Sequence, residues 1–259
     1  MFFQEVFRKV TQAIKKHKWL FLSIFIVQIV FLVVLAVINV KYQLAMVESL
    51  KNVVMTLETA NYNESMIQMG TPFLENPEMI YTSYEAIWSN LKALLGFSFV
   101  AFLIFECFIW AVSSYMLRKQ NFIQLYVKYI AVSLVYLVPA FFVIYLILKS
   151  FWESAFITLS TDVSIFILVI ISYFMMITFS LLHKKAKDII QLTFKIGITK
   201  IDYIAFTFMI CLVVLGFFGL LMYVSTAWSF LVMILLIVLF ILAMIVLRIF
   251  VMAAISELS

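Results

Sequence analysis

The sequence predicts an all-α membrane protein, a bundle of six transmembrane helices with both termini in the cytoplasm. Apolar residues make up 66% of the chain and charged residues 12%, whereas soluble domains have about half and about a quarter. Six uninterrupted apolar runs have the length of a membrane-spanning helix, and the connections between them alternate between basic and acidic. We therefore expect a single membrane domain over residues 1–259.

Residues 1–18 are predicted to form an amphipathic helix that lies in the membrane interface. Helical spacing places apolar side chains on one arc and basic side chains on the opposite arc. The apolar arc holds Phe3, Val6, Phe7, Val10 and Ile14, and the basic arc holds Arg8, Lys9, Lys15 and Lys16. The first span, residues 19–40, opens on Trp19 at the depth of an aromatic belt. No cleavage site of the small-x-small kind follows, so we expect this span to be retained.

Residues 41–92 are acidic and are predicted to form a helical hairpin on the outer side. The stripe Val47, Leu50, Val54 and Leu57 indicates that the first span continues as a helix beyond the membrane. Asn76, Pro77 and Glu78 are typical of a helix start, and Ile80, Tyr84, Ile87 and Leu91 follow on one face. We expect the two stripes to bury each other. A flexible loop is the alternative.

Spans two to four are predicted at residues 93–116, 129–148 and 165–182. The second contains Glu106 near its middle, and the third contains Pro139 at its centre. Basic residues follow the second and fourth spans, as expected on the cytoplasmic side.

Residues 184–198 have apolar and basic residues on opposite faces, which predicts a second interfacial helix. Gly197 is expected to stop this helix. The sequence from Thr199 to Asp202 matches the capping pattern that starts a helix, so the fifth span is predicted at residues 203–223. A tight turn leads to the sixth span, residues 229–254, which contains Arg248.

The distribution of charge predicts the orientation. Fourteen of the eighteen basic residues lie in the N-terminal segment, the two even-numbered connections and the end of the sixth span, and eight of the thirteen acidic residues lie on the other side. The positive-inside rule then places both termini in the cytoplasm of a multi-pass protein of the cell membrane. Anionic lipid headgroups are the expected partners of Arg8, Lys9, Lys15, Lys16, Lys184, Lys185 and Lys187.

Glu106 is the strongest candidate for a functional residue, because a carboxylate near the bilayer centre is costly unless it faces protein or water. It could bind a cation, relay a proton or remain protonated. The structural alternative is a packing role, either as a neutral acid bonded to a neighbouring span or as an ion pair.

Arg248 is the natural partner of Glu106, but it lies close to the predicted end of its span. We therefore favour an arginine that extends to the interface without a partner. Pro139 removes one backbone hydrogen bond and is expected to kink the third span, as in a transporter hinge or a static bundle.

No catalytic, metal-binding or nucleotide-binding motif is present in the sequence. No cluster has zinc-ligand spacing, and no intramembrane histidine or aspartate could activate a serine, so we expect no cofactor and no enzymatic activity. Cys107 and Cys211 both lie in apolar runs and are predicted to be packing residues. The basic residues lie where topology requires them, so a nucleic-acid partner is not expected. Asn63 begins an N-x-S acceptor pattern on the predicted outer side.

Two main functions remain open, and the sequence favours the first; membrane shaping by the amphipathic helices is a third possibility. One is a partner, assembly or accessory protein of a membrane complex, which interacts through the outer hairpin and the amphipathic helices. The other is a small transporter or permease subunit for a hydrophobic or lipid-like substrate, with Glu106, Arg248 and Pro139 along the pathway. The scarcity of intramembrane polar groups argues against a polar solute.

Overall fold

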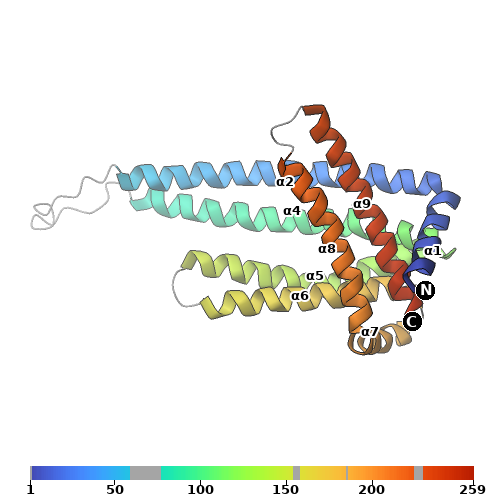
Figure 1. Ribbon diagram of the computed structural model, residues 1–259. Coiled ribbons are helices and arrows are strands. Elements are labelled where there is room, and N and C mark those ends of the chain that lie inside the picture. The colour runs from blue at the N-terminus through green and yellow to red at the C-terminus, as the bar shows by residue number, and fades with distance from the viewer. Residues whose placement is uncertain (1, 59–76, 154–157, 185, 225–229) are drawn as a thin grey trace, which may run out of the picture. The chain divides into compact units, whose positions relative to one another are not determined.

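The computed structural model describes residues 2–58, 77–153, 158–184, 186–224 and 230–259, which contain helices and no strand (Figure 1). The helices are α1 (Phe2–Lys16), α2 (Lys18–Glu58), α4 (Pro77–Leu117), α5 (Phe122–Glu153), α6 (Thr158–Leu181), α7 (Ala186–Thr199), α8 (Ile201–Val224) and α9 (Phe230–Glu257).

Six of these helices, α2, α4, α5, α6, α8 and α9, are long and apolar enough to cross a membrane. They coincide with the six predicted spans, so the prediction of an all-helical, multi-pass membrane protein is confirmed. The helices are longer than the spans; α5, for example, begins at Phe122 rather than 129. The predicted bounds mark where the sequence is apolar, whereas a helix also continues through adjacent polar residues.

The start signals of α4 and α5 are local. Pro77 is the first residue of α4 and Glu78 lies in its first turn, as predicted, because a proline at this position loses no helical hydrogen bond. The side chain of Asn121 caps α5, with its Oδ1 accepting a hydrogen bond from the Ile123 amide at 3.1 Å.

The residues predicted to separate α7 from α8 do not have the roles expected of them. Gly197 does not stop α7, which continues to Thr199. The Thr199 hydroxyl donates to the Lys195 carbonyl at 2.6 Å, inside its own helix, so it does not cap α8. Gly197 is instead a packing residue: a Cβ added there would lie 3.0 Å from Cε1 of Phe174, and the Tyr173 hydroxyl donates to the Gly197 carbonyl at 2.7 Å. Its missing side chain lets α7 approach α6.

Substitution of Gly197 by leucine is therefore expected to lower the stability by about 1–3 kcal/mol, because the new side chain would overlap the ring of Phe174. Thermal unfolding of the purified protein in detergent measures the effect. Gly216→Leu is the matched control, since a Cβ at that position meets nothing within 4 Å in the described part of the chain. Equal losses in both variants would contradict the assigned role.

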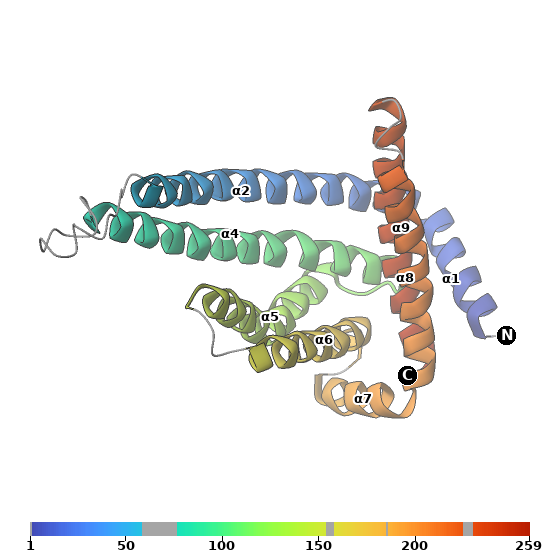
Figure 2. The same cartoon turned by 60° about the vertical axis from the view of Figure 1, so that its left-hand side comes forward.

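The described residues form two compact units. Unit 1 comprises residues 1–31 and 102–259, and unit 2 comprises residues 32–101. In unit 1, α6 is central and packs against α5, α7 and α9, while α8 lies beside α9 (Figure 2). The prediction of a single membrane domain stays a prediction.

Helix α1 forms where residues 1–18 predicted a helix, and part of its apolar arc packs against α9 rather than remaining free. Val6 and Val10 are buried, whereas Phe7 is 64% exposed. An interfacial position of α1 and α7 stays a prediction.

Unit 2 is an antiparallel hairpin in which the second part of α2 runs beside the first part of α4 (Figure 1). The rings of Tyr42 and Phe97 stack with centroids 5.7 Å apart. The predicted burial of both stripes is wrong for α2: Val47, Leu50 and Val54 are exposed, although Ile87 of α4 is buried. The half-buried face of α2 instead carries a mixture of apolar and polar residues: Tyr42, Ala45, Met46, Ser49, Asn52, Val53 and Thr56.

Candidate functional site

Glu106 and Arg248 lie on different helices of unit 1, α4 and α9. On α4, Trp110 follows Glu106 by four residues, so helical geometry places both side chains on one face. On α9, Met252 follows Arg248 by the same interval. The two faces meet, and each charged residue is therefore held by a regular, continuous helix.

The guanidinium of Arg248 forms a buried ion pair with Glu106. Its Nη2 lies 2.8 Å from Oε2 and 3.0 Å from Oε1 of the carboxylate, and the two side chains are only 10% and 8% exposed. The guanidinium also lies over the indole of Trp110, with Cζ 5.5 Å from the ring centroid, a cation–π arrangement.

The prediction that Arg248 extends to the interface without a partner is wrong. The span was expected to end at residue 254, but α9 continues to Glu257. Nine residues, about 13 Å of helix, separate Arg248 from this end. A carboxylate on a neighbouring helix lies within hydrogen-bond distance, and a buried guanidinium is stabilised by such a partner.

One polar atom of this site has no partner. Nη1 of Arg248 is buried and forms no hydrogen bond among the described residues. A buried donor of this kind costs free energy unless water or a ligand satisfies it. Both oxygens of the carboxylate, in contrast, lie within hydrogen-bond distance of Nη2 of Arg248.

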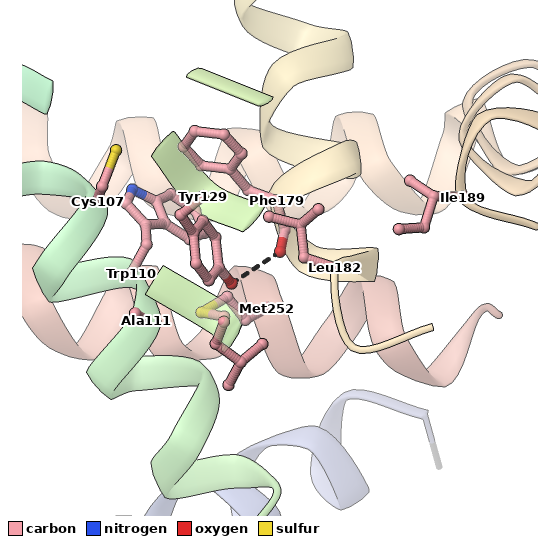
Figure 3. Close-up of a cluster of buried hydrophobic side chains, with 9 residues drawn as sticks. Cys107, Trp110, Ala111, Tyr129, Phe179, Leu182, Ile189 and Met252 are labelled. Carbon is pink, nitrogen blue, oxygen red and sulfur yellow. Dashed lines mark hydrogen bonds between the residues drawn. The ribbon is translucent and has the colours of Figure 1, made fainter. Parts of the chain in front are cut away.

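Trp110, over which the Arg248 guanidinium lies, belongs to a dense apolar cluster. Figure 3 shows the side chains of this cluster. The hydroxyl of Tyr129, from α5, is fully buried and donates to the Phe179 carbonyl of α6 at 2.9 Å. The ring of Phe179 meets Trp110 and Tyr129 edge to face, with centroids 5.1 Å and 5.2 Å away. Cys107, in the same cluster, lies 3.0 Å from the Ser133 hydroxyl, consistent with its predicted packing role. The surroundings of Glu106 are therefore packed by side chains from several helices.

Pro139 lies inside α5, which continues through it. Its side chain is exposed, as is neighbouring Val138, so it is not part of the Glu106 cluster. A role for Pro139 in a pathway with Glu106 stays a prediction.

The basic residues predicted to contact lipid lie in two places, on α1 and between α6 and α7. Arg8, Lys9, Lys15 and Lys16 are exposed on α1, and Lys9 also pairs with Glu257 of α9. Lys184 follows α6 and is half-buried. Lys185 lies outside the described residues, as do the side chain of Lys187 and Asn63.

His183 lies after α6, outside the membrane-spanning segments, and is half-buried. Its Nδ1 lies 3.2 Å from the Ser180 carbonyl, and its Nε2 is buried without a partner among the described residues. Burial, together with the nearby charges of Arg118, Lys184 and Lys128, lowers the pKa of His183 from 6.5 to about 4.

Because His183 is held neutral, the unfolded chain binds a proton more readily than the folded protein between pH 6.5 and about 4. Its contribution to stability is fully present above pH 6.5 and falls as the pH decreases through this window. Thermal unfolding in detergent from pH 8 to pH 4 measures it, and His183→Gln should flatten the curve. An equal flattening in His17→Gln would contradict the assignment.

The sequence analysis missed two residues of unit 1, Trp110 beside the ion pair and Arg118 after α4. Trp110 could have been found by its four-residue spacing from Glu106 on one helix face. Arg118 directly follows α4 and lines a cavity near the end of that helix, but it resembles any other basic residue at the end of a span.

Comparison with known proteins adds no assignment. No protein-family model, no curated protein and no solved structure matches this chain.

Proposed function

We propose that this chain is a non-enzymatic integral protein of the cell membrane that acts as a partner or accessory subunit of a membrane complex. The proposal includes both termini in the cytoplasm and the hairpin of unit 2 on the outer side. The observation that carries it is an exposed apolar stripe on the part of α2 that continues beyond the predicted first span.

Helix length is the first step. α2 and α4 contain 41 residues each, about 60 Å at 1.5 Å per residue, whereas the hydrocarbon core of a bilayer is about 30 Å thick. The charged residues Lys41, Glu48 and Lys51 lie in the second part of α2, where a position in hydrocarbon would be costly. This supports a water-exposed position for that part.

The stripe is the second step. Beyond the predicted span, Leu44, Val47, Leu50 and Val54 of α2 are 64%, 61%, 45% and 43% exposed. They repeat at intervals of three and four residues, the pattern by which one helix packs along another. Apolar side chains in this arrangement are stabilised when a partner removes them from water.

The packed core is the third step. The ion pair neutralises the two charges within the spans, and none of the cavities described here is lined by Glu106 or Arg248. A static contact between α4 and α9 suits a protein that presents surfaces to other proteins.

A transporter or permease subunit for a hydrophobic substrate is the second candidate. Two apolar cavities favour it: one of about 340 Å³ lined by α5, α6 and α7, and one of about 520 Å³ lined by α1, α8 and α9.

Site-specific photo-crosslinking in the native membrane tests the partner role. Crosslinkers at Leu44 and at Val47 should capture the same membrane protein, and Val47→Asp should abolish capture from Leu44. A crosslinker at Glu48, which is exposed on another face of the same turn, is the matched control. Capture of lipid alone from the stripe would contradict the proposal, as would substrate flux in reconstituted vesicles that Glu106→Gln abolishes.

A further inference from the structure

A polar cavity of about 440 Å³ lies where α1, α4 and α9 end in unit 1. Its lining includes Lys9 and Lys16 of α1, Arg118 and Lys119 after α4, and Glu257 of α9. None of these residues takes part in the contacts of the Glu106 cluster. Its volume is within the range of small-molecule sites.

The cavity has an excess of positive charge. Four lysine and arginine side chains face a single carboxylate, Glu257, which already pairs with Lys9. Three cations, Lys16, Arg118 and Lys119, therefore remain without a compensating carboxylate in the lining.

Helix dipoles reduce this excess without removing it. α1, α4 and α9 end at Lys16, Leu117 and Glu257, and each C-terminus carries about half a negative charge at most. Three such ends compensate about half of the three positive charges, so stabilising helix ends does not account for all of these cations.

Arg118 is the most informative of the lining residues. It is half-buried, and no described residue forms a hydrogen bond or an ion pair with its guanidinium. Burial lowers its pKa, with a smaller opposing effect from Glu257. A guanidinium that is partly removed from water without an anion is costly, and an anion in the cavity would offset that cost.

We infer that this cavity binds the phosphate group of an anionic ligand. A guanidinium donates in a planar fork that matches phosphate oxygens, and Lys16 and Lys119 add point charges. The phosphate could belong to a lipid headgroup or to a soluble molecule. Phe3 and Phe7 of the same helix line the apolar cavity of about 520 Å³, which favours including a lipid in the test. The inference does not depend on the proposed partner role.

Binding is tested with the full-length protein in nanodiscs of phosphatidylcholine. The probes are inorganic phosphate, at an ionic strength matched with chloride, and phosphatidic acid added to the disc. Either probe should raise the unfolding temperature in a saturable manner, because a ligand that binds the folded state stabilises it. Lys16→Gln and Arg118→Gln should each weaken the apparent Kd by about tenfold, the loss expected for one charge-assisted hydrogen bond.

Lys15→Gln is the matched control, because Lys15 is the exposed neighbour of Lys16 and does not line the cavity. Stabilisation by phosphatidic acid alone identifies a lipid headgroup, and stabilisation by inorganic phosphate identifies the free group; both support the site. Equal weakening by Lys15→Gln and Lys16→Gln, or no stabilisation by either probe, overturns it. Lys16 is exposed, so Lys16→Gln is expected to fold and tests the site even if Arg118→Gln does not fold.

Discussion

Arg248→Met is expected to lower the free energy of unfolding by about 3–5 kcal/mol, because it leaves the carboxylate of Glu106 buried without its cation. Glu106→Leu should have a comparable effect, since it leaves the guanidinium unpaired. The double variant should lie near the wild type, because two apolar side chains of similar size need no partner. Unfolding with SDS in mixed micelles measures all four proteins in one double-mutant cycle.

The cycle separates a pair from two independent residues. Additive losses in the double variant would show that Glu106 and Arg248 are not coupled. The charge swap, Glu106→Arg with Arg248→Glu, should recover part of the loss of either single swap. Lys15→Met, which removes an exposed cation, is the control and should change the stability little.

Tyr129→Ala is expected to cost about 3–5 kcal/mol, as for other buried aromatic residues, because it opens a cavity in the cluster beside Phe179. Tyr129→Phe keeps the ring and removes only the hydroxyl that donates to the Phe179 carbonyl, so it should cost about 1 kcal/mol. The difference between the variants separates packing from hydrogen bonding in the same unfolding assay.

An exposed aromatic residue of the same helix provides the control for Tyr129. Phe142 lies on α5 and is 59% exposed, so Phe142→Ala should change the stability by much less than Tyr129→Ala. Similar losses in the two variants would contradict the role assigned to the buried cluster.

Much of the fold was predictable because its signals are local. The six spans follow from the length and hydropathy of continuous segments, and the start of α4 follows from Pro77 and Glu78. The continuation of α2 beyond the first span follows from helical spacing. Where a local signal had two meanings, the prediction was wrong: Gly197 resembles a helix stop, but it is a contact of α7 with α6.

The candidate site was predictable only in part. Glu106 stands out in the sequence because a carboxylate in an apolar run is costly, and Arg248 was recognised as its natural partner. Whether they pair could not be decided, because it depends on how far α9 continues and on which of its faces meets α4. The exposed stripe of α2 shows the same limit, since periodicity reveals an apolar face but not what covers it.

The sequence by itself therefore determined that the apolar segments are suited to lipid rather than water. It also determined the six apolar helices, their approximate ends and the residues whose charge requires an explanation. Only the tertiary structure decided the pairings. Glu106 and Arg248 are 142 residues apart, and Tyr129 and Phe179 are 50 residues apart. Hydropathy and helical period act over one or a few turns, whereas these contacts depend on the packing of separate helices, which no local pattern specifies.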